Sequence, residues 1–120
     1  MTKILLESER CYSDKYEIKK FLQEHVNDSV YVIEGTHIAQ QVKRLQENEP
    51  NIHSDISFEE LTHQNMNYVT TLRARLIKDT VKEVHYLYYN LDEDVDPIYY
   101  SLKQLCRYYN VSFKEHKTKY

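Results

Sequence analysis

The chain has 120 residues and a formal net charge of −3 at pH 7, with 16 Lys and Arg against 19 Asp and Glu. This length suits one domain, residues 1–120, because a chain of this size buries a single core. The slight acidic excess argues against a protein whose whole surface binds phosphates. No run approaches the ~20 apolar residues of a membrane helix. We therefore expect a cytoplasmic protein with no membrane contact.

Rare residue types exclude further classes of protein. Gly35 is the single glycine, so no glycine-rich phosphate-binding loop is present. Cys11 and Cys106 have no second Cys or His at metal-ligand spacing, so we expect neither a zinc site nor a disulfide scaffold, and no cofactor. No histidines are paired as HxxxH or HExxH, and we interpret His25 and His85, at apolar positions, as core residues.

The first half of the chain alternates strand and helix patterns. Residues 3–6 form an apolar run typical of a buried strand, and Ser13 can cap the helix that follows. The β-branched run 30–33 predicts a second strand, and Thr36 predicts the N-cap of a second helix. The polar residues 46–55 lack periodicity and predict an excursion loop.

The second half continues with a predicted helix start. Ser57 and Glu60 stand at capping-box spacing, and the helical pattern after them runs to about Asp79. Residues 84–89 predict a central strand. A last helix is predicted to begin at Pro97, where a proline costs no hydrogen bond.

The C-terminus predicts a short closing strand at residues 111–113 and a frayed basic tail at 114–120. Strands that alternate with helices indicate a single α/β domain. We expect a Rossmann-like parallel sheet of about four strands with helices on both faces. In such a sheet the loops at the carboxyl ends of the strands, here 7–10, 34–37 and 90–96, lie at one edge.

An acidic group follows the predicted central strand. Its members lie within five residues and are Asp92, Glu93, Asp94 and Asp96. Carboxylates at this density bind a hard cation or form a solvated loop that enters the next helix, where the helix dipole favours acid. Both interpretations stay open.

The layout resembles the Toprim domain of topoisomerases and bacterial primases. In that family a glutamate ends the first strand, a glycine follows the second strand and a DxD pair follows the third. Glu7, Gly35 and the pair Asp92 and Asp94 stand at the corresponding places. The resemblance implies magnesium bound by Asp92 and Asp94, with Glu7 at the same metal site as general acid and base in phosphodiester chemistry.

A basic cluster offers a second candidate surface. It consists of Arg73, Arg75, Lys78 and Lys82. Such side chains neutralise phosphates in nucleic-acid binding, and they are equally typical of a solvated helix face.

Tyrosine is concentrated near the C-terminus. Within 24 residues lie Tyr86, Tyr88, Tyr89, Tyr99, Tyr100, Tyr108 and Tyr109. One small core does not hide so many rings, and tyrosine is enriched at protein interfaces. We expect partner-binding tyrosines at Tyr88, Tyr89, Tyr99, Tyr100 and Tyr108.

Two functions follow from these patterns. The first is a small non-enzymatic binding or regulatory protein, such as a viral-type inhibitor or an accessory factor, that docks a protein partner or forms a homo-oligomer. The alternative is a Toprim-like magnesium-dependent enzyme that acts on nucleic-acid phosphodiesters.

Overall fold

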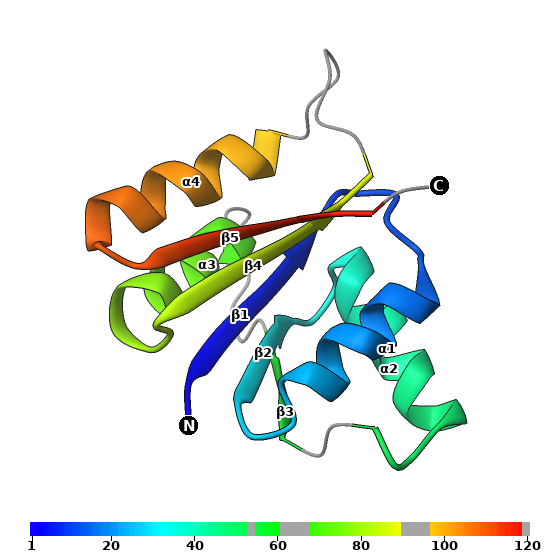
Figure 1. Ribbon diagram of the computed structural model, residues 1–120. Coiled ribbons are helices and arrows are strands. Elements are labelled where there is room, and N and C mark those ends of the chain that lie inside the picture. The colour runs from blue at the N-terminus through cyan, green and yellow to red at the C-terminus, as the bar shows by residue number, and fades with distance from the viewer. Residues whose placement is uncertain (53–54, 61–67, 90–96, 119–120) are drawn as a thin grey trace.

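The computed structural model describes residues 1–52, 55–60, 68–89 and 97–118. The elements in chain order are β1 (Lys3–Ser8), α1 (Lys15–Glu24), β2 (Ser29–Ile33), α2 (His37–Asn48), β3 (Ile56–Glu59), α3 (Tyr68–Asp79), β4 (Glu83–Tyr88), α4 (Pro97–Tyr109) and β5 (Ser112–Lys117). All strand pairs are parallel, and the sheet order is β3-β2-β1-β4-β5 (Figure 1). The predicted Rossmann-like α/β domain is confirmed, with five strands rather than four.

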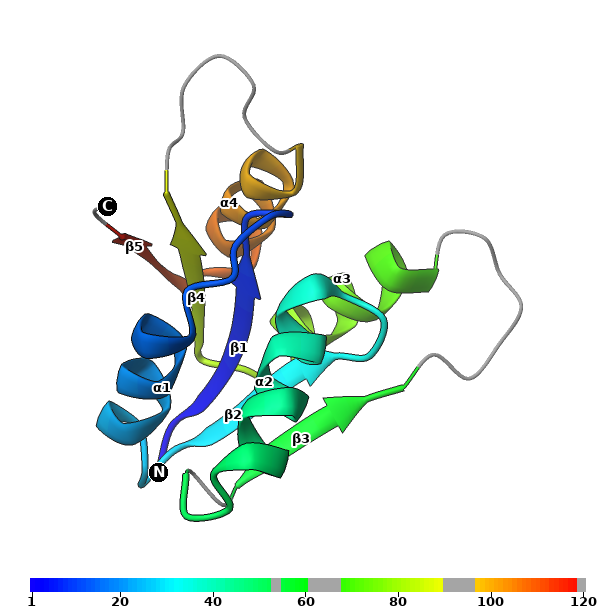
Figure 2. The same cartoon turned by 90° about the vertical axis from the view of Figure 1, so that its right-hand side faces the viewer.

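Two layers of helices cover the sheet (Figures 1 and 2). Ile4 and Leu6 of β1 pack in one core with the apolar faces of α1 and α2, whereas Leu5 packs in a second core with α3 and α4. Neighbouring β1 side chains therefore face opposite cores. This explains why the strand is a continuous apolar run rather than an alternating one. None of the described helices has the length and apolar character of a membrane span.

The helix starts follow local capping chemistry. The Asp14 carboxylate accepts a hydrogen bond from the Glu17 amide at 3.0 Å, so the cap of α1 lies one residue after the predicted Ser13. Thr36 caps α2 as predicted, and its hydroxyl accepts from the Ala39 amide. Helix α2 continues to Asn48, so residues 46–48 of the predicted excursion loop are helical.

Strand β3 replaces the predicted helix start. Ser57 and Glu60 do not form a capping box, because residues 56–59 pair in parallel with β2, with Val30 opposite Ile56 and Ile33 opposite Glu59. Without β3 the outer edge of β2 would expose unpaired backbone groups. Pairing along the strand satisfies these groups and outweighs the local preference for a cap.

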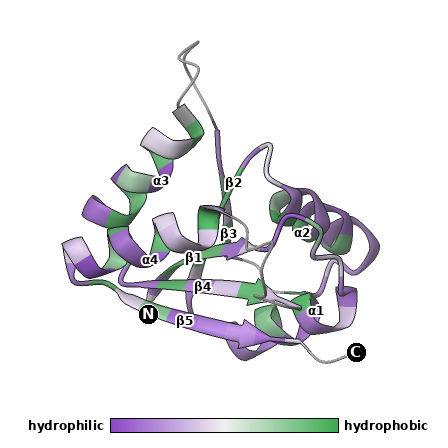
Figure 3. Ribbon diagram, turned by 90° about the horizontal axis from the view of Figure 1, so that it is seen from above, coloured by the Kyte–Doolittle hydropathy of each residue, from purple (hydrophilic) through white to green (hydrophobic). Residues whose placement is uncertain are grey.

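The C-terminal strand is longer than predicted. β5 extends to Lys117, so residues 114–117 belong to the sheet and not to a frayed tail. The strand is largely hydrophilic, as Figure 3 shows, because it forms one edge of the sheet. Beyond the strand, the Thr118 hydroxyl makes a hydrogen bond of 2.5 Å with the Tyr12 hydroxyl, which fixes the chain end against the residues before α1.

Candidate functional site

A buried ion pair lies at the carboxyl edge of the sheet. Glu7 is near the end of β1, on the face covered by α3 and α4, and Arg73 lies in α3. The Arg73 Nε donates to Glu7 Oε2, and the two side chains are only 5% and 3% exposed. Arg73 Nη2 is buried and has no hydrogen-bond partner among the described residues. The described part of the fold therefore gives this guanidinium nitrogen no acceptor.

A cavity of about 350 Å³ opens beside this pair. Its walls come from the end of β1, the first turn of α2, the first half of α3 and the start of α4. Arg10 and His37 supply polar walls, and Ile38, Val69 and Ile98 supply apolar ones. The cavity lies where the predicted loops 7–10 and 34–37 converge.

The entry to α2 shapes one wall of the cavity. Gly35 has a φ of 93°, a left-handed conformation that side chains disfavour, and it turns the chain from β2 into the helix. The Thr36 hydroxyl then donates to the Ile33 carbonyl at 2.7 Å and accepts from Ala39. This arrangement places the positive end of the helix dipole at the cavity.

The predicted metal site is only partly described. Asp92 and Asp94 lie outside the described residues. The third member, Glu7, does not fit a magnesium ligand here, because the Arg73 guanidinium holds its carboxylate and would repel a cation. The described part of the chain brings together no group of three or more His, Cys, Asp or Glu side chains able to hold a metal ion.

The predicted basic cluster is divided by the fold. Arg73 is 4% exposed and faces Glu7, so the fold separates it from the exposed members of the cluster. Arg75, Lys78 and Lys82 are exposed at the end of α3 and in the turn after it. On the helix, Arg73 lies on a different side from the exposed Arg75 and Lys78. The clustering of these residues in the sequence does not show this difference.

The five tyrosines predicted to bind a partner have different environments. Tyr99 is buried and donates its hydroxyl hydrogen to Glu115, and Tyr88 is half-buried. Tyr89 is also half-buried and stacks on Tyr12, with ring centroids 4.7 Å apart. Tyr100 and Tyr108 are 58% and 80% exposed.

The two exposed tyrosines share one surface of α4. We call it the α4 outer face, and it consists of Tyr100, Lys103, Gln104, Arg107 and Tyr108, all exposed. Tyr100, Gln104 and Tyr108 recur at every fourth residue, and Lys103 and Arg107 form the adjacent row. The face therefore combines aromatic rings with two cations.

A histidine cluster lies on the opposite face of the sheet. His85 of β4 lies between His116 of β5 and Glu83, with His85 Nδ1 2.7 Å from His116 Nε2 and His85 Nε2 2.9 Å from Glu83. A carboxylate only accepts, so His85 Nε2 carries the proton. In neutral His85 the Nδ1 atom is then bare, and His116 Nε2–H must donate to it. His25, the C-cap residue of α1, completes the cluster, with its ring 5.1 Å from that of His85.

Burial governs the electrostatics of the cluster. It lowers the pKa of His85 to about 4, although the hydrogen bond to Glu83 acts in the opposite direction. Burial also lowers the pKa of His116. The hydrogen bond from His85 lowers the pKa of Glu83. Burial therefore favours the neutral imidazoles of His85 and His116.

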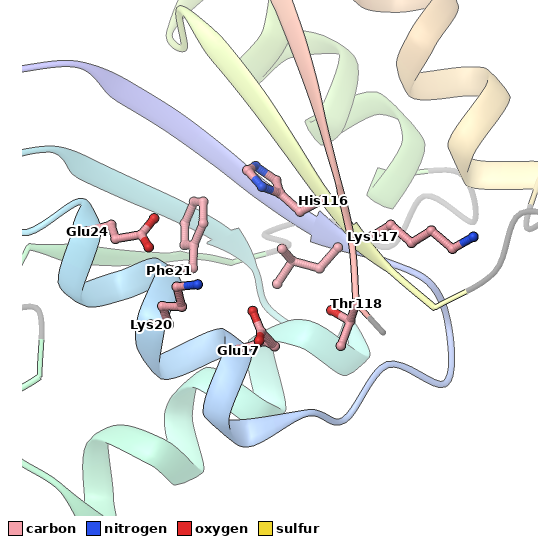
Figure 4. A pocket seen from close by; sticks show the side chains of 8 residues that line it. Glu17, Lys20, Phe21, Glu24, His116, Lys117 and Thr118 are labelled. Carbon is pink, nitrogen blue, oxygen red and sulfur yellow. The ribbon is translucent and has the colours of Figure 1, made fainter. Parts of the chain in front are cut away.

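A hollow of about 230 Å³ adjoins the cluster between α1 and β5. Figure 4 shows the side chains of Glu17, Lys20 and Glu24 on the α1 side and those of His116 and Thr118 on the β5 side.

Sequence analysis placed His85 in the core but missed His116, because it ended the closing strand at residue 113. Extending the strand alternation beyond Phe113 would have placed Lys114 and His116 on one face of the sheet.

Comparison of the chain with models of known protein families and with curated proteins gave no match.

Proposed function

We propose that the protein is a non-enzymatic binding protein that docks a protein partner through the α4 outer face. The supporting observation is the exposure of Tyr100 and Tyr108, at 58% and 80%, beside Lys103 and Arg107. Tyrosine and arginine are enriched at interfaces, where a rigid ring gives a large contact area at a small entropy cost. In the folded chain much of the surface of these two rings is exposed to water and is free to contact a partner.

The charge of the α4 outer face argues for an acidic partner rather than a second copy. A two-fold symmetric dimer brings the same patch of both copies together. The Lys103 and Arg107 rows would then face each other, and like charges opposed across an interface cost several kcal/mol. A partner with carboxylates beside an apolar or aromatic group satisfies both the cations and the rings.

A nucleic-acid partner is less favoured. The chain is acidic overall, with a net charge of −3, and the α4 outer face holds two cations. Phosphate backbones bind through many neutralised charges, so two cations on an acidic protein give weak binding.

The magnesium-dependent alternative stays a prediction for Asp92 and Asp94. The contact between Glu7 and Arg73 counts against it, because a general acid and base must be free to exchange its proton with the substrate. We therefore give the binding function first place.

The experiment is a selection from a phage-displayed random-peptide library against the full chain. Selected peptides are titrated against the wild type, against Arg107→Ser/Tyr108→Ser, and against Tyr16→Ser. Tyr16 is a matched control because it is a tyrosine on α1 with 74% exposure. We expect acidic peptides whose Kd rises about tenfold or more in the α4 variant and is unchanged in the control.

Three outcomes would overturn the proposal. The first is a set of peptides without acidic residues or with equal affinity for the α4 variant. The second is a dimer, found by sedimentation, that dissociates in the α4 variant and so identifies a second copy as the occupant. The third is single-stranded DNA binding at about 0.15 M salt that the α4 variant loses.

A further inference from the structure

The cavity at the carboxyl end of β1 contains donors that the fold leaves unused. We propose that this cavity binds a small organic phosphate, with the phosphate group at Arg73 and the start of α2. This site is separate from the α4 outer face, and neither proposal depends on the other.

The first observation is the unsatisfied guanidinium. Arg73 lines the cavity and uses Nε to hold Glu7, and its buried Nη2 has no hydrogen-bond partner among the described residues. A buried donor without an acceptor costs free energy that an anionic ligand recovers. Guanidinium presents planar, paired donors that match the oxygen atoms of a phosphate or a carboxylate.

The second observation is the helix that points at the same space. The first turn of a helix has amide groups with no acceptor within the helix. In α2 the Thr36 hydroxyl satisfies Ala39, and the Gln40 amide bonds to the Thr36 carbonyl, which leaves His37 and Ile38. Both residues line the cavity. In Figure 2 the tip of β1 lies between α4 and the first turn of α2.

The charged and apolar residues that line the cavity indicate the chemical class of its ligand. Two guanidinium groups, Arg10 and Arg73, line the cavity against one carboxylate, that of Glu7, and the helix dipole adds to the positive side. Ile38, Val69 and Ile98 form the apolar walls. A volume of about 350 Å³ is at the lower end of the range for small-molecule sites. An anion with a small apolar body uses all of these walls, whereas a bare ion does not.

The proposed phosphate site does not need a glycine-rich loop. Such loops bring several backbone amides close to a chain of phosphates, which one glycine cannot do. Here the arginine supplies the charge, and Gly35 serves only to turn the chain into α2. The arrangement therefore suits a single phosphate group.

The test is an NMR titration of the full chain with phenyl phosphate, inorganic phosphate, benzoate and benzyl alcohol. We expect phenyl phosphate to saturate with a Kd near 1 mM or below, and inorganic phosphate and benzoate to bind about tenfold more weakly. The amides of His37 and Ile38 and the Arg73 Nε–H signal should shift together. Benzyl alcohol has the apolar body without the charge, so it should leave these signals unshifted.

Variants separate the site from general electrostatics. Glu7→Leu/Arg73→Met removes the buried pair without changing the net charge, and it should raise the Kd for phenyl phosphate about tenfold or more. If this variant does not fold, Arg10→Gln should raise the Kd about threefold. Lys20→Gln, with the same loss of charge on α1, should leave the Kd unchanged.

Several results would overturn the proposal. One is the absence of a saturable shift at about 10 mM phenyl phosphate. Another is a saturable shift located away from α2 and Arg73. Equal binding of benzyl alcohol would show an apolar site, and tighter binding of benzoate would show a carboxylate site. Unchanged binding in the folded double variant or in Arg10→Gln would also exclude the assignment.

Discussion

Acidification tests the physical basis of the histidine cluster. His85 is 2% exposed and is held neutral between Glu83 and His116. Burial lowers its pKa from 6.5 to about 4, so between these values the unfolded chain binds more protons than the folded one. Stability therefore rises with pH across this window and is lost as the pH falls from 6.5 toward 4.

The size of the loss follows from the two pKa values. One pKa unit corresponds to about 1.4 kcal/mol. Between about pH 7.5 and about pH 5, His85 alone should remove about 2 kcal/mol from the free energy of unfolding. His116 adds a loss of the same sign, because burial lowers its pKa too.

The assay is urea unfolding of the wild type and His85→Gln at both pH values. The glutamine keeps a polar side chain and does not titrate, so the wild type should lose about 2 kcal/mol more than the variant on acidification. His25, Glu83, Lys114 and His116 surround the site in both proteins. His37→Gln is a control outside the cluster, and it should lose as much as the wild type.

Two results would refute this reasoning. One is an equal loss of stability in the wild type and His85→Gln. The other is a directly measured His85 pKa near 6.5 in an NMR pH titration, which would show that the imidazole is not desolvated. If His85→Gln does not fold, the NMR titration still tests whether the pKa of His85 is lowered.

Three further predictions concern stability. Arg73→Met alone should cost about 3–5 kcal/mol in urea unfolding, because it leaves the Glu7 charge buried, whereas Glu7→Leu/Arg73→Met should cost clearly less. Equal costs would show that the ion pair is not the cause. In thermal melting, Thr36→Ala should lose about 1 kcal/mol by removing the α2 cap, and Thr70→Ala, at an exposed position of α3, should lose much less. A similar loss in both would count against the cap. Leu102→Ala should cost about 2–5 kcal/mol because Leu102 is fully buried, and a denaturation cost below about 1 kcal/mol would contradict the packing.

The candidate site was only partly predictable from the sequence. The expectation that loops 7–10 and 34–37 meet at the carboxyl edge agrees with the cavity, because both follow buried strands of a parallel sheet. Arg73 was assigned to an exposed basic cluster, but it lies buried against Glu7. Neighbouring positive charges in the sequence do not show which of them faces the sheet, since this depends on the rotation of α3 about its axis.

The α4 outer face was also only partly predictable from the sequence. Tyrosine density predicted an exposed aromatic surface, and the structure exposes Tyr100 and Tyr108 but buries Tyr99. The helical period separates Tyr99 from Tyr100, because successive residues on a helix point about 100° apart. The clustering alone identified the segment but not the side of the helix.

What the sequence determined by itself is local in physical origin. The apolar run of β1, the β-branched run of β2 and the cap at Thr36 are patterns of neighbouring residues in the sequence, and the elements that they indicate were predicted. Tertiary structure alone decided that residues 56–59 form an edge strand, that Glu7 meets Arg73 and that His85 meets His116. These contacts join distant parts of the chain, so they depend on strand order and helix placement. Burial and backbone pairing in the whole fold therefore outweighed the local signals of these segments.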